Sequence, residues 1–261
     1  PLYSSAASDV YKRQVGTVST LPGSFKGFGR TPDELKVMRR NLLACAEHLA
    51  RLRDRTGTHL RLALEPEPIG HAENTPEALR LFEQLRAEEP AKGLVDAHLG
   101  IAYDTCHFAL QYEEAHEAIT RLNAGGAPVL KFHLSSALKL KPTDVALARL
   151  AKMHEPTYLH QTMGRAKDGS IVRFKDIPLA MAAIDQLRAL EELRVHFHVP
   201  VNADRLSDEL STTNDHLKAA LDVIAKAPGA CRELEIETYT WEVLPPEVRA
   251  ADVADMIAEE Y

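Results

Sequence analysis

Short apolar runs and longer amphipathic stretches alternate along this chain of 261 residues. The runs are rich in Val, Ile, Leu and aromatic residues, which is typical of strands that are buried on both faces of a parallel sheet. We predict six such strands, from the runs VGTVSTL, LRLALEP, LGIAYDT, PVLKFHL, LRVHFHV and ELEIETY at residues 15–21, 60–66, 99–105, 128–134, 193–199 and 233–239.

The stretches between these runs carry helix start and stop signals. Thr31 and Glu34 have the spacing of a capping box, and Pro32 falls at the first helical position between them. An apolar face with helical spacing follows, and Gly57 ends the predicted helix. Three more pairs predict later helix starts: Thr75-Pro76, Ile177-Pro178 and Pro245-Pro246.

The interval from strand to strand is mostly about 30 to 40 residues, which is the length of a βα unit. Repeated βα units predict a single domain over residues 15–261, an N-terminally truncated (β/α)8 TIM barrel with about six of its eight units present. An open doubly wound sheet is the alternative. Two alternating runs around Asp168-Gly169 predict a β-hairpin inserted near residues 157–174.

The first residues do not resemble natural protein sequence. Residues 4–14 read SSAASDVYKRQ, which is the translation of a common transposon-based sequencing adapter. We therefore leave residues 1–14 out of the fold prediction and expect the natural protein to begin further upstream. A barrel without its first two strands would expose two unpaired sheet edges, so we expect the chain as given to aggregate or to remain loosely packed.

Composition and charge narrow the class of protein. With 45% hydrophobic and 26% charged residues, the chain has the composition of a soluble globular domain. Its net charge of −7 disfavours nucleic acid as a partner. The three cysteines are far apart and form no CxxC pair, which indicates reduced thiols and a cytoplasmic location. No apolar run approaches the length of a membrane helix.

Five successive strands end in residues that can bind metal or transfer protons. In a βα barrel the carboxyl ends of all strands meet on one face, so these side chains are expected to surround one point. Imidazole and carboxylate together suit a divalent metal ion such as Mn, Zn, Co or Mg. The residues are Glu65, Asp104, His107, His133, His196, His198 and Glu237.

Each of these residues also has a plain structural interpretation. A lone His at a strand, such as His133, is more often a hydrogen-bonded structural residue than a ligand. Asp104 has the position of a cap for the following turn. Glu67 and Glu235 are alternatives to Glu65 and Glu237, because residues two apart share one face of a strand. Glu65 and Glu67 also have a plain interpretation as solvated loop residues.

The motifs as a set resemble a known superfamily. LxLEP, YDTCH, KFHLS, a polar pair on the next strand and LEIET are similar to the xylose isomerase-like TIM barrels. That superfamily includes sugar isomerases, ketose 3-epimerases, hydroxypyruvate isomerase and endonuclease IV. Across residues 15–261 the chain most resembles the EboE-type metabolite traffic proteins of this superfamily.

This resemblance implies roles for individual residues. Metal ligands of the superfamily fall on Glu65, Asp104, His133 and Glu237. His107 takes the place of a residue that contacts substrate oxygens in the epimerases and metal in endonuclease IV. The pair His196 and His198 stands where endonuclease IV has Asp-x-His, and this departure argues against a trinuclear zinc site.

The function implied is that of a divalent-metal-dependent isomerase or epimerase acting on a small polyhydroxylated or carbonyl metabolite. Glu65 and Glu237 would transfer the proton and His107 would orient the substrate. Contacts to the substrate are expected from His196, His198, Tyr239 and Trp241. The alternatives are a non-catalytic, metal-dependent metabolite-binding protein and, disfavoured by the net charge, a phosphodiesterase similar to endonuclease IV.

Overall fold

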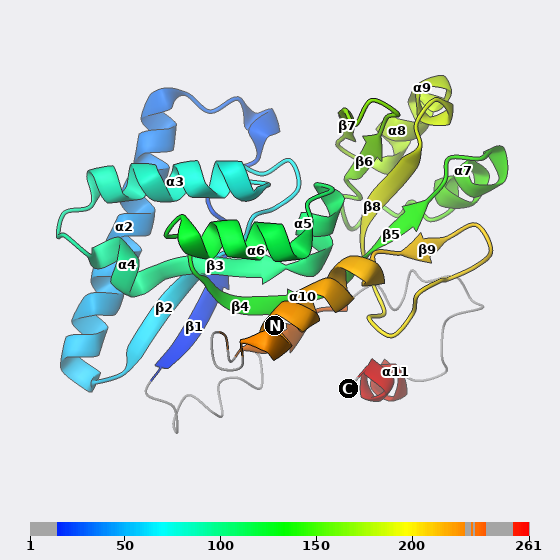
Figure 1. The fold of residues 1–261 in the computed structure, drawn as a ribbon. Helices are drawn as coiled ribbons and strands as arrows, with labels where there is room; N and C mark the ends of the chain where they lie inside the picture. The colour runs from blue at the N-terminus through cyan, green and yellow to red at the C-terminus, as the bar shows by residue number, and fades with distance from the viewer. Residues whose placement is uncertain (1–14, 228–230, 232, 239–252, 261) are drawn as a thin grey trace. The chain divides into compact units, whose positions relative to one another are not determined.

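The computed structural model describes residues 15–227, 231, 233–238 and 253–260 (Figure 1). The described residues form two compact units. The first comprises residues 15–103, 119–132, 231 and 233, and the second comprises residues 104–118, 133–227, 234–238 and 253–260. The expectation of a single domain stays a prediction.

The first unit is built on parallel strands. β2 pairs with β1 in parallel over six residues, and with β3 in the same direction. The elements in this part of the chain are β1 (Val15–Thr20), η1 (Lys26–Phe28), α2 (Pro32–Thr56), β2 (His59–Leu64), α3 (Thr75–Glu88), α4 (Leu94–His98), β3 (Leu99–Asp104), α6 (Ala115–Ala124) and β4 (Val129–Leu134). Three of these elements reach into the second unit: the last residue of β3, Asp104, the first four residues of α6 (115–118) and the last two of β4, His133 and Leu134.

Helix α2 begins and ends where the sequence predicts. The Thr31 side chain accepts a hydrogen bond from the Glu34 backbone N–H, and the Glu34 carboxylate accepts one from the Thr31 backbone. Pro32 stands at the start of the helix. Gly57 ends it at a φ of 73°, in the left-handed region that glycine adopts without strain.

The second unit is built on an antiparallel sheet. Strand β8 pairs antiparallel with both β5 and β6, and β6 forms an antiparallel hairpin with β7. Its elements are α5 (Thr105–Leu110), β5 (Ser136–Leu140), α7 (Asp144–Ala151), β6 (Thr162–Arg165), β7 (Ile171–Phe174), α8 (Ile177–Ala182), α9 (Ile184–Arg188), β8 (Glu192–Val199), β9 (Ser211–Thr212), α10 (Asn214–Lys226), β10 (Leu234–Ile236) and α11 (Val253–Glu260).

Strand β8 separates an apolar side from a polar side. Side chains point to opposite faces at successive residues, so Val195, Phe197 and Val199 share one face. All three are buried and belong to the main apolar core of the second unit. His196 and His198 lie on the other face, as the alternation predicts, and both are buried. The core therefore fixes the orientation of the two imidazoles.

The prediction of a (β/α)8 TIM barrel is wrong. The described strands of the first unit have the order β1-β2-β3-β4, and five strands of the second unit form an antiparallel sheet of order β7-β6-β8-β5-β9. Strand β5 follows β4 after Ser135 alone, so no helix connects them. A βα barrel needs a helical crossover after each strand and parallel pairing throughout.

The error has a physical cause in β8. A continuous apolar run shows that a strand is covered on both faces, but it does not specify the direction of its neighbours. Strand β8 is covered in this way at the centre of an antiparallel sheet. The hairpin of β6 and β7 was expected as a loop insertion, whereas β6 is a member of this sheet through its pairing with β8.

Other expectations on local structure have mixed outcomes. The helix starts at Thr75-Pro76 and Ile177-Pro178 are confirmed, as α3 and α8. Pro245-Pro246 lies outside the described residues. No helix among the described residues combines the length and the apolar character that crossing a bilayer requires. Cys45, Cys106 and Cys231 form no disulfide with one another in the described part of the chain.

We predict that His216 makes the second unit less stable in acid. His216 is buried at the start of α10, and this burial, followed by the charge of Arg194, lowers its pKa to about 4, whereas Asp215 raises it. Between about pH 6.5 and about pH 4 the unfolded chain therefore binds a proton that the folded chain does not. The unfolding free energy should fall by about 3 kcal/mol across this range.

Urea unfolding of the parent chain and of His216→Gln, measured between about pH 7 and about pH 4, checks this. The variant should lose less stability than the parent on acidification. Equal losses in both proteins would show that His216 is not responsible.

Candidate metal centre

Asp104 lies at the junction of β3 and α5 and caps the helix. Its Oδ1 atom accepts hydrogen bonds from the backbone N–H groups of Cys106 and His107, at 2.7 and 3.0 Å. The Ser135 hydroxyl donates a third bond to the same oxygen at 2.6 Å. These three donors fix the carboxylate in one orientation.

The other oxygen of Asp104 has a different environment. Oδ2 is buried and accepts no hydrogen bond from any described residue. It lies 3.6 Å from His107 Nε2 and 3.7 Å from His198 Nε2. A buried carboxylate oxygen without a donor is expensive unless a positive charge compensates it. Oδ2 is therefore the atom of this site that most needs a cation.

The pKa of Asp104 reflects this surrounding. Burial alone raises it, but His107, His198 and His133, together with the Ser135 hydrogen bond, outweigh burial and hold the pKa below its usual range. The carboxylate is thus negatively charged at neutral pH and available to a metal ion.

Three imidazoles meet beside this carboxylate. His196 Nε2 lies 3.1 Å from His107 Nε2 and 3.1 Å from His198 Nε2. The rings of His107 and His196 are nearly perpendicular, with centroids 4.7 Å apart. Burial, followed by the neighbouring His107 and His198, lowers the pKa of His196 well below its ordinary value. His196 is therefore a neutral ring at neutral pH.

The far side of two of these rings fixes their tautomers. His198 Nδ1 lies 2.7 Å from the backbone oxygen of Glu237, and His196 Nδ1 lies 2.8 Å from Gln161 Oε1. Both oxygens can only accept a hydrogen bond, so each Nδ1 carries the hydrogen of its ring. The Nε2 atoms of the two rings then face each other, 3.1 Å apart. An arrangement of this kind is typical of metal-binding histidines, which are held through the opposite nitrogen.

His133 and Glu237 form a second part of the site. His133 Nδ1 lies 2.9 Å from a Glu237 carboxylate oxygen. His133 is almost fully buried, with 6% of its side chain exposed, whereas Glu237 is 34% exposed. Together with Asp104, these residues offer ligand atoms within 4.8 Å of one another. The backbone fixes this pair too, because Glu237 N–H donates to Leu134 O at 2.9 Å.

The second unit thus brings together most of the predicted residues. Glu65 belongs to the first unit, so its part in the ligand set stays a prediction. Tyr239 and Trp241 lie outside the described residues. The residues that the second unit places in one cluster are Asp104, His107, His133, His196, His198 and Glu237.

Three further residues at this site were not predicted as members. Ser135 orients Asp104, and Gln161 orients His196. Cys106 offers a ligand atom within 4.8 Å of those of His196 and His198. Cys106 and Ser135 flank predicted ligands in the sequence, which is a signal that could have found them. Gln161 reaches the site only through the pairing of β6 with β8, which the apolar pattern does not specify.

Comparison with known proteins identifies no relative: no protein-family model, curated protein or solved structure matches this chain. The resemblance to the xylose isomerase-like superfamily therefore stays a prediction from the motifs.

We predict that Ser135→Ala weakens the binding of a divalent ion without preventing folding. The substitution removes the shortest hydrogen bond to the Asp104 carboxylate. The carboxylate is then held less firmly in one orientation, and its negative charge is less stabilised. Loss of such an outer partner typically lowers metal affinity about 10- to 100-fold. A competition titration with a zinc-sensitive dye measures the change.

Ser136→Ala is the matched control, because this neighbouring serine is equally buried but its hydroxyl lies 3.4 Å from the Thr213 hydroxyl instead. It should bind metal like the parent. A similar loss of affinity in both variants would contradict the role given to Ser135.

Proposed function

We propose that this chain binds a divalent metal ion of the Mn, Zn, Co or Mg range through Asp104, His133 and Glu237. We further propose that it uses the ion to isomerise or epimerise a small polyhydroxylated or carbonyl metabolite. One observation carries the proposal: Asp104 Oδ2 is a buried, charged oxygen with no hydrogen-bond donor among the described residues. A metal ion is the partner that removes this penalty.

The donor set fits such an ion. Two carboxylates and an imidazole, within 4.8 Å of one another, match the oxygen and nitrogen ligands that these metals accept. Two carboxylates also balance the charge of a divalent cation. The partial exposure of Glu237 supports a site that is open on one side, as catalytic metal sites are.

The proposed reaction needs a group that removes a proton from the carbon next to a carbonyl. The proton then returns to the same carbon in an epimerisation, or to the former carbonyl carbon in an isomerisation. A bound divalent ion supplies Lewis-acid stabilisation of the negative charge that develops on the substrate oxygens. Glu237 is the proposed general base, because its carboxylate is the exposed member of the cluster. His133 Nδ1 lies 2.9 Å from that carboxylate, and His107 is proposed to orient the substrate.

The substrate class rests on the resemblance of the motifs to sugar isomerases and epimerases. A ligand set supports binding of a metal, and it does not by itself distinguish turnover from storage or transfer of a metabolite. The cytoplasmic location inferred from the scattered cysteines is part of the same proposal.

A solvent-exchange experiment tests the catalytic proposal without knowledge of the product. The chain, loaded with each metal in turn, is incubated with a panel of aldoses, ketoses and hydroxy-carbonyl acids in deuterated water. We expect metal-dependent exchange of a carbon-bound hydrogen for deuterium, detected by NMR. Asp104→Asn should lose metal and exchange together, because it removes the negative charge that the ion needs.

Glu237→Gln should abolish deuterium exchange, and Glu235→Gln serves as its matched control. Glu235 lies two residues earlier, on β10, and is not part of the described cluster. The control should retain metal and exchange. Metal binding without exchange for any substrate in the parent chain would overturn the catalytic proposal and favour a binding protein.

A further inference from the structure

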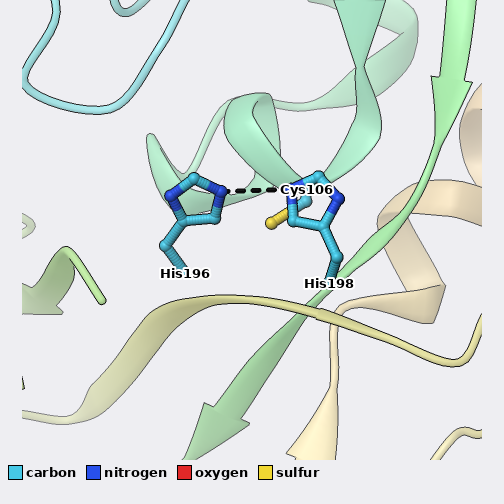
Figure 2. Close-up of side chains that lie close together, drawn as sticks. All are labelled: Cys106, His196 and His198. Carbon is cyan, nitrogen blue, oxygen red and sulfur yellow. Dashed lines mark hydrogen bonds between the residues drawn. The ribbon is translucent and has the colours of Figure 1, made fainter. Parts of the chain in front are cut away.

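Cys106 lies against two of the clustered histidines. Its thiol and the imidazoles of His196 and His198 offer ligand atoms that all lie within 4.8 Å of one another, and all three residues are buried. Figure 2 shows the Cys106 sulfur beside the His198 ring, with a dashed line between the two imidazoles, whose Nε2 atoms lie 3.1 Å apart. The group shares no residue with the set Asp104, His133 and Glu237, and it adjoins that set where His198 Nε2 lies 3.7 Å from Asp104 Oδ2.

The backbone holds the thiol in place. Cys106 N–H donates to Asp104 Oδ1 at 2.7 Å and to the Ser135 hydroxyl at 3.0 Å. The sulfur lies 3.6 Å from the backbone oxygen of Phe197, to which the thiol donates a weak hydrogen bond. Phe197 stands between the two histidines in the sequence. The thiol is therefore packed directly against the strand that carries both imidazoles.

The imidazoles are held with equal firmness. Strand β8 is bonded on both edges, to β5 and β6, so its backbone has little freedom to move. Hydrogen bonds from Nδ1 to Gln161 and to the Glu237 backbone turn both Nε2 lone pairs inward. The two Nε2 atoms lie 3.1 Å apart. In a tetrahedral zinc site, neighbouring ligand atoms are separated by about 3.3 to 3.6 Å, so a small adjustment suffices.

We propose that Cys106, His196 and His198 form a separate metal position that selects a soft or borderline ion, Zn²⁺ or Cu⁺, through a thiolate. Sulfur is the ligand that distinguishes this position from the oxygen-rich set of Asp104, His133 and Glu237. Thiolate and imidazole together favour Zn²⁺ and Cu⁺ over Mg²⁺ and Mn²⁺. The proposal goes beyond the proposed function, since it requires neither catalytic turnover nor an ion bound by Asp104, His133 and Glu237.

Binding exchanges one bond for another at the sulfur. The S–H bond breaks, its proton passes to solvent, and the sulfur electron pair forms the bond to the metal ion. The hydrogen bond to Phe197 is lost in the same step. One proton is thus released for each ion bound, and no oxidant or reductant is needed.

Cobalt titration of the full chain tests the proposal, because a thiolate bound to Co²⁺ produces a sulfur-to-cobalt charge-transfer absorption in the near ultraviolet. We expect this absorption in the parent chain and its loss in Cys106→Ser. Cys45→Ser, which changes a partly exposed thiol on α2, is the matched control and should keep the absorption. Persistence of the absorption in Cys106→Ser would overturn the proposal.

Two further measurements make the test independent of whether Cys106→Ser folds and of the ion proposed to bind Asp104, His133 and Glu237. X-ray absorption of the zinc-loaded parent chain should show a sulfur scatterer at about 2.3 Å from zinc. A zinc shell of nitrogen and oxygen alone would refute the thiolate ligand. Glu237→Ala should keep the cobalt absorption even if it abolishes metal binding by the set Asp104, His133 and Glu237. Loss of the absorption in this variant would show that the chain has only one metal position.

Discussion

The burial of the Asp104 carboxylate is the constraint on which the site depends. A charge removed from water must be compensated by donors or by a cation. One oxygen of Asp104 obtains its compensation from the first turn of α5 and from Ser135, and this anchors both segments to each other. The other oxygen is left among imidazoles. The same side chain therefore begins a helix with one atom and defines a binding position with the other.

The histidine cluster follows from this arrangement. Imidazoles compensate a buried anion most strongly when they bring a cation with them, either a proton or a metal ion. Burial disfavours the proton on His196, as its lowered pKa indicates. Hydrogen bonds on the far side of His196 and His198 direct their lone pairs toward each other. His196 is thus organised to bind a metal ion and poorly suited to hold an extra proton.

Much of the local structure could be predicted from the sequence. Apolar runs located six strands: β1, β2, β3, β4, β8 and β10. Thr31, Pro32, Glu34 and Gly57 marked both ends of α2, because caps and turns depend on nearby residues. Strand direction could not be predicted in this way, because β8 is buried on both faces whichever way its neighbours run. Strand β5 was missed since it follows β4 with no break in the sequence pattern.

The site was predicted only in part, because sequence patterns predict contacts between nearby residues and do not predict strand pairing. His196 and His198 share a face because side chains alternate along any strand, whatever sheet contains it. Asp104 and His107 lie close because one helical turn separates them. Gln161 was out of reach, since its contact with His196 needs the pairing of β6 with β8. The fold prediction was wrong, but the predicted short-range geometry of the site did not depend on it.

The separation of β8 into an apolar face and a polar face has an evolutionary consequence. Phe197 and its apolar neighbours hold the strand in the core, while His196 and His198 face the opposite way. Substitution of either histidine by another polar residue during evolution would therefore change the chemistry of the site. The apolar packing that holds the strand would stay the same. An insertion of one residue in the strand has the opposite effect, because it moves the aromatic ring and the imidazoles to each other's side in a single step.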